Sequence, residues 1–278
     1  DRGYFQVRYF SFEPSVHLRS YVKKYYYVEF DCEEYFKQCN LPASHAIMCF
    51  QIGSDEPTLL YDGVPPFTHR NYFAGPMRYP LYIESPGRYN ALVVLFTELG
   101  GYYLFKIPQS EYANRLWCLN DFIGASSEKV IAHIHSLQNT WERIQSIEQF
   151  LTDFFEARAR TLPSLEYALK KISSTYSNKT LTEICSELPC SLRTLERQFQ
   201  YYIGTTPKEF ARMIRLHEVY KSLNNNSSER LHDLIHKLGY YDQAHLIRDM
   251  KSYVGITPKR FEKHARFIKP YLSEKNKT

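Results

Sequence analysis

The pattern of apolar and polar positions divides the chain into two unlike parts. Before residue 130, short apolar runs are separated by Gly and Pro, a pattern that favours β-strands joined by turns. These runs predict strands over residues 5–12, 25–30, 46–52, 58–61, 79–84 and 89–96. Short strands at regular spacing are typical of a barrel or a sandwich.

Two helices are predicted to follow, over residues 128–138 and 142–158. The second helix carries apolar residues at i, i+3 and i+4 spacing, which form a stripe on one face. The members of this stripe are Ile144, Ile147, Leu151, Phe154 and Phe155. The stripe packs either on the β-rich part of the same chain or on a second copy, and the second choice would make it a homodimer contact.

The distribution of charge supports two domains, 1–160 and 161–278, with Pro163 suited to start a helix just after the boundary. Residues 1–160 carry 15 basic and 18 acidic side chains, a net charge of −3, whereas residues 161–278 carry 20 and 12, a net charge of +8. The basic character therefore belongs to the C-terminal part. A basic domain of this kind predicts a polyanionic partner, most simply nucleic acid.

The C-terminal part also contains an internal repeat. The segment GTTPKEF at residues 204–210 recurs as GITPKRF at residues 255–261, 51 residues later. Each copy follows two short amphipathic stretches joined by a tight turn, and Gly204 or Gly255 is suited to end the second stretch as a helix. The repeat predicts two helix-turn-helix units, over about residues 181–202 and 231–254, joined by a helix that begins at Pro207.

The motifs of the two units are Leu181-x2-Ile184-Cys185-x2-Leu188, Ser191-x3-Leu195-x-Arg197-x-Phe199, Gly204-x2-Pro207, and, in the second unit, residues 238–243, Arg248, Lys251 and residues 255–258. This set resembles the DNA-binding domain of the AraC/XylS family of bacterial transcription regulators. The resemblance implies an all-α domain that binds an operator in double-stranded DNA and regulates transcription. An activator of this kind would also contact RNA polymerase.

The N-terminal part resembles, more weakly, the cupin-like sensory domain of a subset of these regulators, through residues 17–22, 74–76 and 95–101. The overall expectation is an α+β multidomain protein: a cupin-like β-barrel with helices, followed by the double helix-turn-helix domain. By this resemblance the N-terminal domain would bind a small-molecule effector, form a homodimer, or both.

The second helix of each unit is predicted to lie in the major groove. In the first unit, Leu195, either Gln198 or Phe199, and Tyr202 are expected to face inward. The remaining positions face the groove, and they are Arg193, Thr194, Glu196, Arg197 and Gln200. Arginine pairs with guanine and glutamate accepts from cytosine, so Arg193, Glu196 and Arg197 are the predicted base contacts.

In the second unit the predicted DNA contacts are Gln243, Ala244, His245, Ile247 and Arg248. Glutamine can read adenine, and apolar side chains can contact the thymine methyl group. Cationic side chains near helix N-termini suit phosphate contacts. On that basis Lys208, Arg212, Lys259 and Arg260 are predicted to touch the DNA backbone.

Enzyme classes receive little support from the sequence, and no catalytic residue, metal ligand or cofactor is predicted. A metal-binding cupin needs an H-x-H pair on a strand, whereas His133 and His135 fall in a predicted helix, where their side chains diverge. A zinc-dependent DNA-repair domain needs four paired cysteines, and the six cysteines are scattered. A cupin-type metalloenzyme or a repair protein remains the alternative. No apolar run reaches the ~18–20 residues of a membrane span, and a cytoplasmic location is expected.

Overall fold

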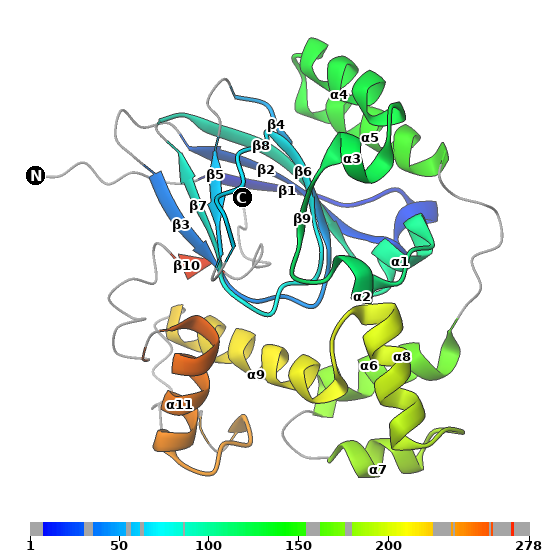
Figure 1. The fold of residues 1–278 in the computed structure, drawn as a ribbon, viewed down its shortest axis with the longest axis vertical. Coiled ribbons are helices and arrows are strands. Elements are labelled where there is room, and N and C mark those ends of the chain that lie inside the picture. The colour runs from blue at the N-terminus through cyan, green and yellow to red at the C-terminus, as the bar shows by residue number, and fades with distance from the viewer. Residues whose placement is uncertain are drawn as a thin grey trace, which may run out of the picture.

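The computed structural model describes residues 8–30, 36–53, 57–61, 64–85, 87–153, 162–175, 180–224, 235, 237–255, 257 and 268–269. It places a β-rich part with its own helices on one side and a helical part on the other (Figure 1). The described residues between 8 and 153 supply the first part, and those between 162 and 257 supply the second. The predicted boundary at residues 160–161 lies outside the described residues.

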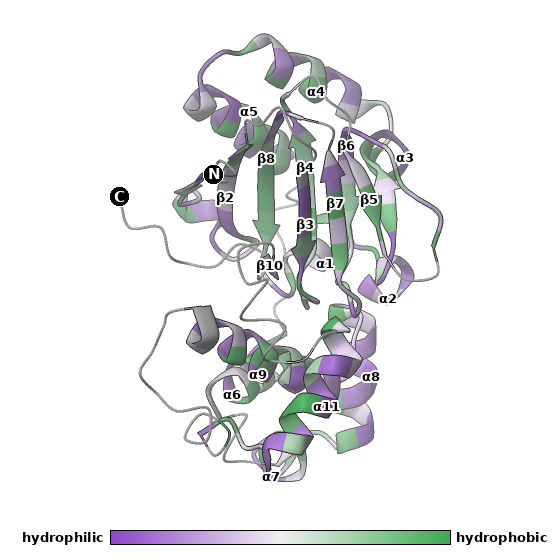
Figure 2. Cartoon of the chain, turned by 90° about the vertical axis from the view of Figure 1, so that its left-hand side faces the viewer, coloured by the Kyte–Doolittle hydropathy of each residue, from purple (hydrophilic) through white to green (hydrophobic). Residues whose placement is uncertain are grey.

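A six-stranded antiparallel sheet forms the centre of the N-terminal part, with the strand order β1-β2-β8-β4-β6-β9. Its strands are β1 (Arg8–Phe12), β2 (Val22–Phe30), β8 (Tyr89–Phe96), β4 (Ile47–Gln51), β6 (Asn71–Ala74) and β9 (Leu116–Cys118). Every residue of β4 is buried, and β8 is almost continuously hydrophobic (Figure 2). A strand with this pattern is covered on both faces.

A second sheet covers one face of the first. Its order is β10-β3-β7-β5, from β10 (Ile268–Lys269), β3 (Phe36–Asn40), β7 (Leu81–Ser85) and β5 (Thr58–Leu60). Alternate residues of both sheets, among them Val28, Cys49, Leu59, Ile83 and Val93, share one apolar cluster. The domain is therefore a two-layered β-sandwich, and the described residues do not form the closed barrel that the sequence predicted.

Helices cover the opposite face of the large sheet. They are α1 (Gly100–Phe105), α2 (Gln109–Tyr112), α3 (Leu119–Ile123), α4 (Ser126–Ser136) and α5 (Thr140–Asp153), after the short helix η1 (Val16–Leu18). The ring of Phe73 on β6 stacks on Phe122 of α3 at 4.1 Å between centroids. Aromatic side chains thus fill the space between this face and the helices.

The apolar stripe of α5 is part of this core. Ile144, Ile147 and Leu151 are at most 1% exposed and belong to the cluster that includes Tyr25, Phe50 and the helix α4. The interpretation of the stripe as a dimer contact is therefore wrong for these residues, because the sheet of the same chain already covers them. Phe154 and Phe155 lie outside the described residues.

The C-terminal part contains α6 (Pro163–Thr175), α7 (Leu181–Ser186), α8 (Leu192–Ile203), α9 (Pro207–Asn224) and α11 (Gln243–Val254). No strand was expected here, and that expectation is wrong: β10 pairs in parallel with Cys39 and Asn40 of β3. A strand of two residues is too short to show an alternating pattern in the sequence. Its hydrogen-bonding partners lie in the N-terminal sheet, far away along the chain. None of the helices in the described part of the chain is both long and apolar enough to cross a membrane.

A half-buried histidine lies where the two parts meet. The His217 ring on α9 forms a hydrogen bond with the carbonyl oxygen of Pro42, at 2.8 Å. Burial lowers the pKa of His217 to about 4; Lys221 and Lys23 act in the same direction, while Glu218 and the carbonyl of Pro42 oppose them. Burial also lowers the pKa of the neighbouring His45. Both rings are therefore neutral near pH 7.

Replacing Leu151 by Ala should lower the free energy of unfolding by about 2–5 kcal/mol, because it opens a cavity in the fully buried core beneath the sheet. Trp141→Ala on the same helix is the matched control, since Trp141 is 51% exposed and should cost much less. Denaturant unfolding followed by fluorescence or circular dichroism measures both. Equal small losses for the two variants would contradict the buried position of Leu151.

Acid should destabilise the chain through His217. In the unfolded chain this histidine has a pKa of about 6.5, so between pH 6.5 and 4 the unfolded state binds a proton that the folded state does not. Stability is therefore complete above pH 6.5 and falls as the pH drops toward 4, by about 3 kcal/mol for this group. Thermal unfolding midpoints measured from pH 7.5 to pH 4.5 should fall less steeply for His217→Gln than for the wild type. Parallel pH profiles would count against this assignment.

Candidate DNA-binding interface

The first helix-turn-helix unit is formed by α7 and α8. Thr180 begins α7 with a capping box: its hydroxyl accepts from the backbone N–H of Glu183 at 3.2 Å, and the Glu183 carboxylate accepts from the backbone N–H of Thr180 at 2.6 Å. Ser191 begins α8 by accepting from the backbone N–H of Thr194 at 3.2 Å. A short turn thus separates two helices that each start at a well-formed cap.

One face of α8 is buried and the other is exposed. Leu195, Phe199 and Ile203 are fully buried against α6 and α9. The predicted base contacts on the other face, Arg193, Glu196 and Arg197, are exposed, and so is Gln200. Thr194 is half-buried, and its hydroxyl lies 3.0 Å from the hydroxyl of Ser191, so it supports the helix cap.

The second unit presents α11 in the same way. Asp242 begins the helix by accepting from the backbone N–H of His245 at 2.7 Å, and Leu246, Met250 and Val254 are buried. The predicted contacts Gln243, Ala244 and Arg248 are exposed, while His245 and Ile247 are half-buried. The His245 ring packs edge-to-face on Tyr240, at 5.2 Å between centroids. Its position is therefore fixed by the helix cap and by an aromatic neighbour.

Arg212 has partners within the protein that the sequence did not predict. Its guanidinium binds the carboxylate of Asp249 and the hydroxyl of Ser252, and lies 4.1 Å from the centre of the Tyr253 ring. The same carboxylate accepts from the Tyr240 hydroxyl at 2.9 Å. Arg212 therefore joins α9 to the second recognition helix rather than standing free for a phosphate group.

The other predicted phosphate contacts are only partly described. Lys208 is exposed in the first turn of α9, where a cation can meet a phosphate beside the helix N-terminus. Lys259 and Arg260 lie outside the described residues.

The structure adds one exposed side chain that the sequence did not single out. Tyr241 is 87% exposed in the turn directly before Asp242, at the N-terminal end of the second recognition helix. The sequence could have indicated Tyr241 by its position in the predicted turn of the second unit, because a large aromatic side chain in such a turn is not part of the core. It lies next to the predicted contacts Gln243 and Ala244.

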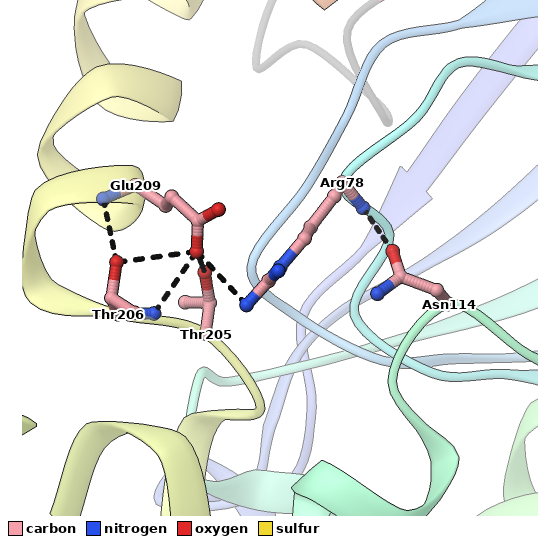
Figure 3. A network of polar contacts seen from close by, with 5 residues as sticks. All are labelled: Arg78, Asn114, Thr205, Thr206 and Glu209. Carbon is pink, nitrogen blue, oxygen red and sulfur yellow. Dashed lines mark hydrogen bonds and ion pairs between the residues drawn. The ribbon is translucent and has the colours of Figure 1, made fainter. Parts of the chain in front are cut away.

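A polar network at the start of α9 connects the first unit to the N-terminal domain (Figure 3). One carboxylate oxygen of Glu209 accepts from the hydroxyl of Thr205 at 3.1 Å and from the backbone N–H of Thr206 at 3.3 Å. The same oxygen lies 3.0 Å from the guanidinium of Arg78, which comes from the loop between β6 and β7. The backbone N–H of Arg78 donates to Asn114 at 2.6 Å. The helix cap is thus also a contact between domains.

The histidines and cysteines that were considered for metal binding lie outside the recognition helices α8 and α11. His133 and His135 of α4 line two different depressions, as expected for positions two apart on a helix. In the described part of the chain, no three His, Cys, Asp or Glu side chains gather to hold a metal ion. The described cysteines, Cys39, Cys49, Cys118, Cys185 and Cys190, are free thiols.

Comparison with protein families gives two matches. Residues 184–264 match the model of a helix-turn-helix domain, and residues 10–117 match that of a domain of unknown function, DUF6597. The comparison with curated proteins gives no match.

Several solved structures are similar. ToxT from Vibrio cholerae is 13% identical over 93% of this chain and 98% of its own, with a TM-score of 0.49. The C-terminal domain of AraT, a response regulator from Geobacillus stearothermophilus, is 21% identical over 42% of this chain and 96% of its own, with a TM-score of 0.36. An AraC-type transcriptional regulator from Chromobacterium violaceum is 22% identical over 37% of this chain and 92% of its own, with a TM-score of 0.34.

The geometry and the family match together define a helix-turn-helix protein that binds DNA. The match covers both recognition helices, α8 and α11. The domain is that of a DNA-binding transcriptional regulator. The individual DNA contacts remain predictions.

Arg197→Ala should weaken binding to a duplex selected by the wild-type protein by about 1–3 kcal/mol and relax the preference at particular base pairs. Lys208→Ala is the matched control, because a phosphate contact should weaken selected and random duplexes alike. Titration of both variants with both duplexes, followed by fluorescence anisotropy, measures the difference. Equal losses on the two duplexes for both variants would contradict the division of roles.

Proposed function

We propose that the protein reads an operator in double-stranded DNA with both recognition helices and regulates transcription from it. The observation that carries this proposal is the pair of helices, α8 and α11, whose inner faces are buried while the polar residues of the outer faces are exposed. Residues 161–278, which contain them, have a net charge of +8, and such a charge favours binding to the phosphate backbone. Arg193, Glu196 and Arg197 are the proposed base contacts of the first unit, and Gln243, Ala244 and Arg248 those of the second.

The N-terminal domain is proposed to have the sensory role of the cupin-like domains that it resembles. A depression of about 470 Å³ between the edge of the large sheet and α4 is the candidate effector site, lined by Arg70, Asn71, Asn120, Glu128 and His135, among others. Burial and the charges of Arg70 and Arg143 lower the pKa of His135. The depression thus combines a cation, a carboxylate, amides and a neutral imidazole, a set that suits a small polar ligand.

Pairing of two copies at repeated sites and contact with RNA polymerase complete the proposal for a regulator acting in the cytoplasm. Two linked DNA-binding domains gain affinity through their effective concentration, so weak pairing is sufficient. The pairing surface is not the stripe of Ile144, Ile147 and Leu151, because these side chains are core.

The full-length protein should bind a duplex of random sequence at low salt, with an affinity that falls steeply as salt rises. Each phosphate neutralised by a Lys or Arg contributes about −0.9 to the slope of log K against log salt concentration. Anisotropy titrations from 50 to 300 mM salt give this slope. A protein that binds no duplex at the lowest salt concentration, or whose slope is near zero, would refute the proposed function.

A further inference from the structure

The N-terminal domain completes the hydrophobic core of both helix-turn-helix units. Leu99 and Tyr103, from the start of α1, belong to the same buried cluster as the inner face of α8. Cys39 and Leu41, at the end of β3, belong to the cluster formed by α9 and α11. One domain therefore packs against the first unit at one place and the second unit at another (Figure 1).

Gln109 makes the most direct contact with a recognition helix. Its side chain is fully buried, and its amide nitrogen donates to two carbonyl oxygens, those of Glu98 and Tyr202, each at 2.6 Å. The last carbonyl groups of a helix have no partner within the helix. Tyr202 is in the last turn of α8, so a side chain of the N-terminal domain supplies the partner that the recognition helix lacks.

The backbone beside this hydrogen bond is also fitted to the N-terminal domain. Gly204 ends α8 with a φ of 75°, and a Cβ atom at this position would lie 2.9 Å from the carbonyl oxygen of Gln109. Tyr102 packs edge-to-face on Tyr202, at 4.7 Å between ring centroids. The end of α8 is thus held by a hydrogen bond, a close backbone approach and an aromatic contact.

The start of α9 and the second unit are held by separate contacts. Arg78 reaches Glu209 in the first turn of α9 (Figure 3), and the carbonyl oxygen of Pro42 contacts His217 in the middle of that helix. Arg212 then links α9 to α11 through Asp249. Beyond the second unit, β10 pairs with β3 of the N-terminal sheet.

These contacts leave the DNA-reading faces uncovered. Arg193, Arg197 and Gln200 on α8 and Gln243 and Arg248 on α11 are all exposed while the domains are in contact. The N-terminal domain contacts the C-terminal end of α8 and packs into the core behind α11. Docking of the domains and binding of DNA therefore use different surfaces.

We propose that the N-terminal domain is a brace that fixes the relative position of the two recognition helices on DNA, and that Gln109 is the positioning residue for α8. The proposal rests on the proposed function, because the two helices must enter major grooves about one helical turn, ~34 Å, apart. A rigid connection favours one spacing between the two recognised sequences. Loss of the brace leaves each helix able to read its bases but lets the spacing vary.

The test compares full-length wild type with Gln109→Met, which keeps the size of the side chain and removes both hydrogen bonds. Gln149→Met is the matched control, since Gln149 is exposed on α5 and bonds only Asp153 of the same helix in the described structure. Each protein selects duplexes from a library with a random core of 30 base pairs. Wild type and control should enrich two short sequences at one fixed separation.

Gln109→Met should enrich the same two sequences at several separations, and its affinity for the wild-type duplex should fall about tenfold, within the usual range of coupling between sites. Affinity for a duplex that carries one of the two sequences should be unchanged. If the variant and the wild type enriched the two sequences at the same separation and bound the duplex with the same affinity, the brace proposal would be overturned and the proposed function would stand. Failure of the wild type to enrich any sequence would overturn the proposed function, and the brace with it.

Hydrogen exchange on the wild type provides a second test that needs no variant. With the selected duplex bound, the amides of residues 109–113 and 199–204 should remain as protected as in the free protein, because the brace stays in place. Faster exchange in these segments on binding would mean that DNA releases the N-terminal domain, and would overturn the proposal. This measurement decides the matter even where Gln109→Met fails to fold.

Discussion

The structure depends on the packing of the N-terminal domain into both helix-turn-helix units. A unit of two short helices buries little apolar surface by itself, and isolated helices of this length are marginal in water. Leu99 and Tyr103 complete the core behind α8, and Cys39 and Leu41 complete the core behind α11. The second unit therefore has its position set by β3 as well as by α9. The N-terminal domain is therefore a structural support for both recognition helices.

The central sheet of the N-terminal domain is buried on both faces, so its contacts with the C-terminal domain come from the loops at one end. One face packs on the smaller sheet, and the other packs on α3, α4 and α5. Helices on a single face leave the loops at one end of the sheet free to meet the C-terminal domain (Figure 1). Pro42, Arg78 and Gln109, which contact the helices below, all lie in or beside such loops. The stripe on α5 belongs to this sheet and not to a second copy of the protein.

The two domains also differ in net charge. The net charge is −3 before residue 161 and +8 after it, so the electrostatic attraction to DNA belongs to the helical domain. Not every cation there is free for that purpose: Arg212 is bound to Asp249 and Ser252 and holds two helices together. Arg193 and Arg197 are exposed and remain available. The local partners of each arginine, and not the total charge, decide its role.

The sequence by itself determined the helix-turn-helix repeat, the inner position Leu195, and most of the longer strands, because these follow local periodicities of 3.6 and 2 residues. Caps at Thr180, Ser191 and Asp242 could likewise be read locally. The tertiary structure alone decided that the strands close as a sandwich, that residues 36–40, 71–74, 116–118 and 268–269 join the sheets, and that the α5 stripe is core. Short strands take their hydrogen bonds from neighbours distant in sequence, and Gln109 meets Tyr202 across 93 positions. No local pattern records which partner completes such a contact.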